Sequence, residues 1–509
     1  MKALSGKTLL MWIPALAGWL ALGAVLGALG VPAWALLLLD LLATGALLWW
    51  IARPTVCIEA RGFLLPDREG PSALTPYGNA AAWVSGFGTV GVIAAILTMG
   101  QGAFALVAGM VGGLLVSTHL LAPALAQADA RSLPDWASAR FGARGGRVVR
   151  GLLVASGIAI VAVQMGFAAL VAEAVGVSPL AILPLVAALV LLAVLAGGLG
   201  TMLPAQAALF VVLLAGVLVP ALWLGISRTG IPVPHLAPGA LLHEIAVAEN
   251  RLGIARGAGG WPTVALGLTA LFGTLALPHT LVRWPVERGA GEARYFAQRG
   301  VAFAALVASA VPLFAIAAWA DILTAALGSG IPPASLDTAR EAVTGGIAAL
   351  APPAWLLAAL GAGAVAAIVA ACASAAFMVA SAAGGDPARE TAGGVLSRAR
   401  WAASGAVIAG AVAAMVLPFD PLAAFLALLA IATSALLAPL VLGLTWPRLT
   451  AGGALAGLVV GGVWCLVAFA LGWSAAGGAA LVGLALSASA SVAVSLMRRH
   501  DPAPAVRKS

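Results

Sequence analysis

The chain has 509 residues, of which 62% are hydrophobic and only 9% are charged, against about 25% charged residues in soluble domains. This composition excludes a soluble globular protein and indicates an all-α polytopic membrane protein. The net charge is +8, but the lysines and arginines form no basic stripe with interleaved aromatic residues. Nucleic-acid binding is therefore excluded as well. The three cysteines are isolated and indicate neither disulfides nor a metal site, and no motif indicates an enzyme or a cofactor.

Apolar runs of about 20 residues cross a bilayer, and on that measure the chain is predicted to have about fourteen transmembrane helices. The first run is too long for the apolar core of a signal peptide, so we interpret it as a retained span. The predicted spans are 8–29, 33–52, 80–101, 102–125, 148–172, 178–197, 202–226, 262–282, 297–325, 353–383, 401–417, 421–446, 451–472 and 475–496.

The distribution of lysine and arginine predicts the orientation. With fourteen spans, both termini and the loops after even-numbered spans share one side, which holds 22 of the 26 lysines and arginines. Positive residues accumulate on the cytoplasmic side, so both termini are predicted to be cytoplasmic, in a plasma membrane that we take to be a bacterial inner membrane. The long loops 227–261 and 326–352 are then outside, and 497–509 is a cytoplasmic tail.

Two inner segments between the spans differ in character. The loop 126–147 contains SLPDWASARFG, which predicts a short amphipathic helix that begins near Pro134 and lies along the membrane interface. Residues 388–400 are predicted to be a plain polar linker. Both segments therefore belong to the predicted cytoplasmic face.

Two predicted spans are interrupted. The span 80–101 carries Gly86, Gly88 and Gly91, and the span 262–282 carries Gly273 and Pro278. Proline removes a backbone donor and clashes with the preceding turn, so the second helix is expected to open just before it. Opening a helix in hydrocarbon costs several kcal/mol for each unsatisfied group unless these groups line a cavity or meet a ligand. A helix that is merely kinked for packing is the alternative.

Each interrupted helix begins a group of five predicted spans, 80–226 and 262–446. Because five is odd, the second group has the opposite orientation in the membrane, as in an inverted repeat. The spans within 1–52 and within 451–496 form two peripheral helices at each end of the chain. Corresponding interrupted helices in two halves point to a binding site at the interface between the repeats.

Several motifs, in order and at matching spacing, resemble the sodium:solute symporter family, particularly its acetate permease (cation/acetate symporter) branch. They are GTLALPHTLVRW at 273–284 with EAR at 292–294, SLPDWASARFG at 132–142, VAVQMG at 161–166 and the segment 197–224. The resemblance covers roughly 33–446 and implies a LeuT-type five-plus-five inverted repeat with extra peripheral helices. It also implies a secondary-active transporter of a small solute, a monocarboxylate such as acetate, that works by alternating access.

The predicted substrate site contains four residues. By the resemblance, Thr274 and Gln164 match positions near the family's substrate pocket, and Gly273 opens the matching motif. His279 follows the helix break, where an imidazole can hydrogen-bond a carboxylate or titrate near neutral pH. The alternatives are structural: His279 serving the freed carbonyls of its own helix, and Thr274 and Gln164 acting as ordinary interhelical contacts.

The positions that resemble the family's cation site depart from its pattern. They are Ser85 and Gly88 at the first break and Ala370 and Ala371 in the span 353–383, where the family usually has two hydroxyl groups. Sodium is a hard cation that needs oxygen ligands, and alanine supplies none from its side chain. The sequence therefore predicts a degenerate site, with a proton gradient favoured over sodium as the driving force.

Three further polar residues lie apart from the predicted substrate site. Ser374 is predicted to lie on a different helix face from Ala370, and Gln206 is predicted to be interfacial because it falls near the end of a span. Asp40 is an intramembrane acid and by default a functional candidate, but it lies on a peripheral span, where pairing with a neighbouring helix or subunit is expected instead. The lost hydroxyls leave a second function open, a transporter-derived sensor or accessory subunit that binds solute without moving it.

Overall fold

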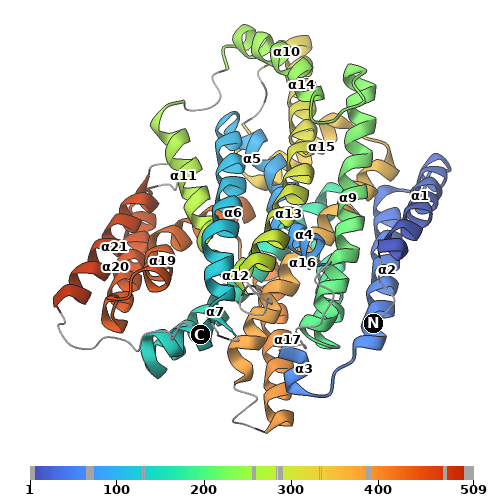
Figure 1. The fold of residues 1–509 in the computed structure, drawn as a ribbon. Coiled ribbons are helices and arrows are strands. Elements are labelled where there is room, and N and C mark those ends of the chain that lie inside the picture. Colours follow the sequence, from blue (N-terminus) through green and yellow to red (C-terminus); the bar gives the residue numbers. More distant parts are fainter. Residues whose placement is uncertain are drawn as a thin grey trace.

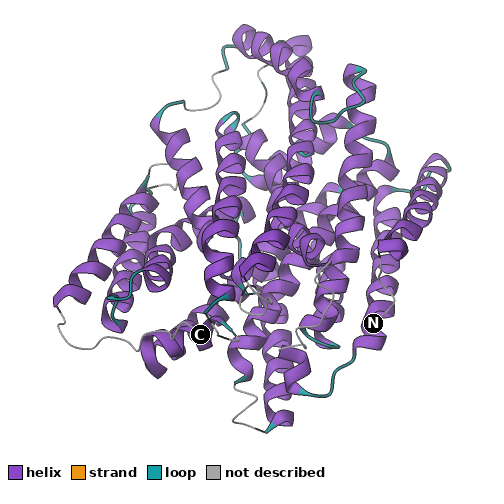
Figure 2. Cartoon of the chain, in the orientation of Figure 1, coloured by secondary structure: helices purple, strands orange, loops and turns teal. Residues whose placement is uncertain are grey.

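The computed structural model describes residues 6–64, 74–128, 130, 132–254, 259–282, 284, 290–331, 333, 335–385, 391–473 and 478–497. All regular elements in these ranges are helices (Figure 2). Residues 498–509 of the predicted cytoplasmic tail lie outside the described residues. An all-α fold is therefore confirmed for the described part of the chain.

The helices that precede residue 230 include two with special roles below, the π-helix η3 and the long α7. They are α1 (Gly6–Ala28), α2 (Ala33–Ala52), the 3-10 helix η1 (Arg53–Thr55), α3 (Ala60–Leu64), α4 (Thr75–Val84), η3 (Phe87–Gly91), α5 (Val92–Met99), α6 (Gly102–Ala126), α7 (Leu133–Ala174), α8 (Pro179–Leu195) and α9 (Leu199–Thr229).

The second half of the chain contains a second π-helix, η5. Its helices are α10 (Ala237–Leu252), α11 (Trp261–Ala276), α12 (Pro278–Leu281), α13 (Ala290–Ala310), α14 (Pro312–Ser329), α15 (Ala339–Leu350), α16 (Ala354–Gly384), α17 (Ala392–Val416), α18 (Pro421–Ile431), η5 (Ala432–Leu436), α19 (Leu437–Thr445), α20 (Ala451–Ala470) and α21 (Ala479–Met497).

Ten helices in the described residues are long and apolar enough to cross a membrane, or eleven when the bent pair formed by α4 and η3–α5 counts as one span. The other three predicted spans coincide with shorter apolar helices at Ala15–Ala28, Pro179–Leu195 and Trp261–Ala276. A polytopic membrane protein is thus confirmed, whereas the count of fourteen and the inverted repeat stay predictions.

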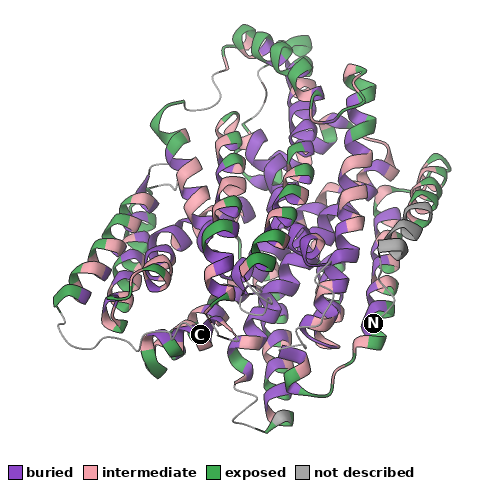
Figure 3. Ribbon diagram, viewed as in Figure 1, coloured by how far each residue is buried: buried purple, intermediate pink, exposed green. Residues whose placement is uncertain are grey.

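The helix α16 forms the centre of the bundle and packs against α2, α4, α7, α8, α9 and α17. In its most apolar stretch 89% of the residues are buried, against 28% for α20 and α21. Small residues allow this close packing: a Cβ on Gly363 would lie only 3.0 Å from the Cα of Gly216 on α9. Figure 3 shows the buried centre, and Figure 1 shows α1–α2 and α20–α21 at opposite edges.

The predicted amphipathic segment is helical and forms the first part of α7. Ser132 caps it by accepting a hydrogen bond from the backbone nitrogen of Asp135 at 3.3 Å. It ends at Gly142, whose φ of 76° is unfavourable for other residues. Arg140 fastens the segment to the bundle by donating to the carbonyl of Gly443 at 3.1 Å.

The prediction of a plain linker at 388–400 was wrong for its second part, because α17 begins at Ala392. Arg400 accordingly lies inside a helix, where its guanidinium donates to the carbonyls of Cys57 at 2.7 Å and Leu195 at 3.1 Å. The long side chain of Arg400 contacts two other segments of the chain. Such long-range contacts cannot be predicted from the local pattern of polar residues.

Both long loops predicted to be outside contain a helix, α10 in one and α15 in the other. At the start of α15, the backbone nitrogen of Ala339 donates to Asp420 at 2.6 Å, and Arg340 donates to Glu173 at the end of α7 at 2.8 Å. The hydrogen bond and negative charge of Glu173 raise the pKa of Arg340. The loop helix α15 is therefore fastened to the ends of α7 and α18.

Candidate functional site

The first helix break lies at Ser85, between α4 and η3. Ser85 has a φ of 53° and a ψ of −173°, and the helix axis bends there by 51°. Positive φ is costly for a residue with a Cβ, about 1–3 kcal/mol, and persists only where the surroundings enforce it. The π-helix η3 follows directly, and π-helical turns are frequent at functional sites. The break predicted near Gly86 is confirmed.

Gln164 of α7 satisfies the backbone that this break exposes. Its Oε1 accepts a hydrogen bond from the backbone nitrogen of Gly86 at 2.8 Å, and both residues are buried. A Cβ on Gly86 would lie 2.9 Å from Gln164 Oε1 and 2.8 Å from the side chain of Phe167, so only glycine fits. The packing of α7 thus brings Gln164 to the opened backbone of the first break.

Two backbone carbonyls at the first break accept a hydrogen bond from a side chain of the same helix. The hydroxyl of Thr89 donates to the carbonyl of Ser85 at 3.3 Å and to that of Gly86 at 3.1 Å. Gly88 lies inside η3, where the nearest atoms to an added Cβ belong to Val84. The two predicted cation positions on this helix therefore lie at the break, with one carbonyl already bonded to a hydroxyl.

The second break lies at Leu277, between α11 and α12, as predicted. Leu277 has an extended conformation, with φ −63° and ψ 116°. Pro278 imposes it, because the proline ring disfavours helical geometry in the residue before it. The hydroxyl of Thr280 donates to the carbonyl of Leu277 at 2.7 Å. Here too a nearby hydroxyl satisfies the opened backbone.

The two broken helices meet at α12. This short helix contacts α4, α7 and α16, and it carries His279, whose side chain is buried. Figure 1 shows α12 near the middle of the bundle. His279 therefore lies on a short helix that contacts α7, the helix of Gln164, and α4, the helix that precedes the first break.

Two neighbours in sequence, Gly273 and Thr274, face different helices. A Cβ on Gly273 would lie 2.6 Å from the carbonyl oxygen of Leu429 on α18, so this glycine permits close helix packing. Thr274 faces α6, where a Cβ on Gly113 would lie 3.0 Å from its own Cβ. The buried Thr274 hydroxyl has no hydrogen-bond partner among the described residues. The close packing of α11 on α18 thus explains the glycine at position 273. The hydroxyl of Thr274 has no hydrogen-bond partner among the described residues and could bind a ligand.

Aromatic pairs flank the breaks, a feature that the sequence did not single out. Trp83, in the last turn of α4, lies 6.0 Å from Trp284 between ring centroids. Beyond the first break, the rings of Phe87 and Phe425 stack at 4.4 Å and 12°. All four side chains are buried. Aromatic contacts thus lie on both sides of the first break.

At the predicted cation positions on α16, hydrogen-bonding groups are already occupied by Gln206, a residue that was predicted to be interfacial. Gln206 of α9 is completely buried, and its Nε2 donates to the carbonyl of Ala370 at 2.6 Å and to the hydroxyl of Ser374 at 3.0 Å. The prediction for Gln206 was wrong because α9 begins earlier than expected and continues past the expected end, which moves the residue inward. Ser374 shares a helix face with Ala370, since residues four apart lie one above the other.

Ala371, the remaining position, is also completely buried on α16. Its methyl group offers no ligand, so the side chains at both predicted cation positions are apolar. Among the described residues, no group of three or more histidine, cysteine, aspartate or glutamate side chains converges. The polar groups that meet at α16 are the Gln206 amide, the Ala370 carbonyl and the Ser374 hydroxyl, which are hydrogen-bonded to one another.

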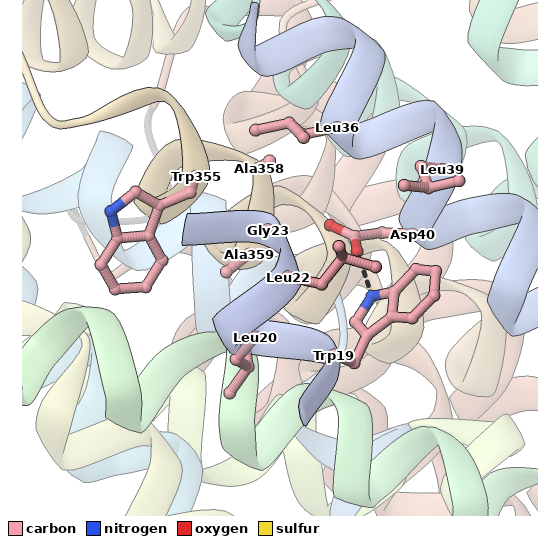
Figure 4. A pocket seen from close by; sticks show the side chains of 10 residues that line it. All are labelled: Trp19, Leu20, Leu22, Gly23, Leu36, Leu39, Asp40, Trp355, Ala358 and Ala359. Carbon is pink, nitrogen blue, oxygen red and sulfur yellow. Dashed lines mark hydrogen bonds between the residues drawn. The ribbon is translucent and has the colours of Figure 1, made fainter. Parts of the chain in front are cut away.

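Asp40, the predicted intramembrane acid, pairs with a neighbouring helix. Its Oδ1 accepts a hydrogen bond from the indole nitrogen of Trp19 on α1 at 2.6 Å, as Figure 4 shows. The surrounding side chains come from α1, α2 and the start of α16. The helix α2, which carries Asp40, lies at the edge of the bundle (Figure 1). Asp40 is thus a contact of the peripheral helices.

Comparison with known proteins adds independent findings. A model of the sodium:solute symporter family matches residues 72–461. The solved structure of a Na⁺-coupled sialic acid symporter, in a substrate-bound outward-open state, is similar with a TM-score of 0.72 and 15% identity, covering 92% of this chain and 97% of that chain. At this identity the similarity concerns the fold alone. The search of curated proteins gave no significant match.

Proposed function

The chain belongs to the sodium:solute symporter family, whose members are secondary transporters, and we propose that it moves a small organic anion, a monocarboxylate such as acetate, by alternating access. The membrane in this proposal is the bacterial inner membrane, with both termini in the cytoplasm. The breaks at Ser85 and Leu277 support it, because broken helices at the midplane are the means by which such transporters form a binding site.

The observation that carries the proposal is the orientation of Gln164. The N–H of Gly86 can only donate, so the atom of Gln164 that faces it must be the amide oxygen. The amide nitrogen then points elsewhere, and it donates to no described residue. A buried amide with two unused N–H groups beside an opened helix is a donor pair suited to a carboxylate.

His279 and Thr274 are the other proposed substrate residues. His279 lies on α12, which contacts the helices of Gln164 and of the first break. Thr274 adds a buried hydroxyl with no partner among the described residues, one turn before the second break. Gly273 contributes by letting α11 approach α18 closely. A small anion would thus meet neutral donors and one imidazole, a side chain that can take up or release a proton.

We propose that the coupling ion is a proton, or that the solute gradient alone drives transport. Gln206 supports this choice because its N–H group already donates to the carbonyl of Ala370 and to Ser374. The carbonyl of Ser85 likewise accepts the hydroxyl of Thr89. A sodium ion at these positions would have to displace hydrogen bonds and would gain few oxygen ligands.

The decisive experiment is uptake of labelled acetate into proteoliposomes that contain the purified protein. An inward proton gradient should increase initial uptake at least tenfold over liposomes without protein, and an inward sodium gradient should add nothing. His279→Gln should lose the dependence on the proton gradient. The matched control His119→Gln should keep it, because His119 is exposed and bonded to Gln298 at 3.0 Å.

A solute sensor or accessory subunit is the second candidate, and the closed cation positions at Ala370 and Ala371 favour it. The same preparation separates the two functions. Saturable acetate binding without uptake under any gradient would establish the sensor, and uptake against a gradient would exclude it. Absence of both binding and uptake would mean that the substrate is not a monocarboxylate.

A further inference from the structure

A cavity of about 570 Å³ lies between α7, the break of α11–α12, α18–α19 and α20. Its volume is within the range of ligand sites, about 300–1,000 Å³. It lies next to the substrate junction, because Ala276 and Pro278 form part of its wall. None of the residues proposed to bind substrate lines it.

The walls of this cavity are almost entirely apolar. Leucine, isoleucine, valine, alanine, glycine and proline dominate, with Trp136 and Phe141 from the amphipathic segment at one end. The hydroxyl of Ser156 is turned back onto its own helix, where it donates to the carbonyl of Leu152 at 2.6 Å. Water needs two to four polar partners in a cavity, so this cavity is suited to hydrocarbon.

The rim of the cavity faces the side of the bundle. Two lining residues from different helices are exposed there, Val148 of α7 at 39% and Leu455 of α20 at 47%. The neighbouring surface of α20 continues the apolar face with the exposed side chains of Val459 and Val463. An apolar opening on the outer face of a membrane-spanning bundle is in contact with lipid chains.

Arg144, two residues beyond the kink of α7, is the one charged side chain among the described residues that line the cavity. Its side chain is exposed and forms no hydrogen bond or ion pair with the described residues. The preceding arginine on the same segment, Arg140, instead donates through Nε and Nη2 to backbone carbonyls at the end of α19. Arg144 is thus available to a negatively charged group at the polar end of the cavity.

We propose that this cavity binds one acyl chain of an anionic membrane phospholipid, whose phosphate lies against Arg144. The apolar walls match the chain, the rim admits it from the bilayer, and the guanidinium matches the headgroup. Trp136 and Phe141 close the headgroup end by packing on Gly443, where an added Cβ would lie 3.0 Å from both rings. The bound acyl chain would contact Pro278, so it would stabilise the broken helix α11–α12 on its lipid-facing side.

Photocrosslinking tests the proposal in lipid nanodiscs. The probe is phosphatidylglycerol with a diazirine on one acyl chain, at low mole fraction in phosphatidylcholine nanodiscs that hold the full chain. Adducts should concentrate on the peptides that carry Leu152 and Leu458, both in the cavity wall. The same diazirine on phosphatidylcholine should give at least fivefold fewer adducts there.

Two pairs of variants complete the test. Leu458→Trp fills the cavity and should abolish these adducts, whereas Val459→Trp, on the exposed side of the same helix, should not. Arg144→Gln should remove the preference for phosphatidylglycerol, and Arg147→Gln, exposed but outside the cavity lining, should retain it. Adducts spread evenly over the lipid-facing helices, or equal labelling by both lipids in the unmodified protein, would overturn the proposal.

Discussion

The side-chain amide of Gln206 donates a hydrogen bond to the backbone carbonyl of Ala370 at 2.6 Å, across the contact between α9 and α16. The same nitrogen donates to the hydroxyl of Ser374 at 3.0 Å. An N–H group presents the positive end of a dipole, so it satisfies the carbonyl and hydroxyl oxygens that a cation would otherwise use. A neutral amide thus links two helices at the positions that resemble a cation site.

Gln206→Glu is expected to make the protein sensitive to sodium. A carboxylate there would place negative oxygens against the oxygens of Ala370 and Ser374, which costs stability unless a cation or proton intervenes. The melting temperature of the variant should fall and should rise again when sodium chloride replaces choline chloride at constant ionic strength. The unmodified protein should respond equally to both salts.

The control for that measurement is Gln101→Glu, since Gln101 is exposed in the turn between α5 and α6. It should show no sodium-specific shift. A steep, saturable dependence of transport or stability on sodium in the unmodified protein would contradict the proposed role of Gln206.

Substitution of Gln164 should separate its structural role from its proposed role in binding. Gln164→Leu leaves the buried N–H of Gly86 unsatisfied, at a cost of about 1–3 kcal/mol in unfolding free energy. Gln164→Glu retains an oxygen for that N–H, so it should keep more of the stability. It removes the amide donors and adds a like charge, so acetate affinity should fall at least tenfold, or about 1.4 kcal/mol. Unchanged affinity in Gln164→Glu would exclude the amide nitrogen as a ligand for substrate.

Pro278→Ala should let the second break close. Alanine removes the restriction that holds Leu277 extended, so α11 and α12 can join in a continuous helix. The protein should remain folded, while substrate affinity measured by saturation of uptake falls tenfold or more. Pro312→Ala is the matched control, because the residue before it, Val311, is already helical with φ −62° and ψ −38°. Equal effects of the two substitutions would show that the break is not used in binding.

Cysteine labelling tests the predicted orientation. Cys372 and Cys465 are buried, so Cys57 is the native thiol that a reagent reaches. Cys57 is expected to be cytoplasmic and to react with an impermeant maleimide only after the membrane is opened. A cysteine at Ala240, exposed on α10, should react in intact cells. Labelling of Cys57 in intact cells would contradict the count of fourteen spans.

The sequence by itself determined the protein class, the approximate positions of the long apolar helices and both helix breaks. These properties are local: an apolar run of sufficient length forms a membrane helix, and Pro278 restricts the residue before it whatever surrounds it. The amphipathic start of α7 was predictable for the same reason, since Ser132 and Gly142 define its ends. The motifs also sufficed to indicate the family, which the family match confirmed.

Only the tertiary structure decided which polar groups meet. Gln206 and Ala370 lie 164 residues apart, and their contact depends on the rotation and depth of α9 against α16. The different directions of Gly273 and Thr274 follow from the packing of α11 between α6 and α18. Helix periodicity predicts which residues share a face of a helix. Which other helix packs against that face depends on small residues, because they let two helices approach closely. The buried position of Gln206 in the centre of the protein is therefore a result of long-range packing.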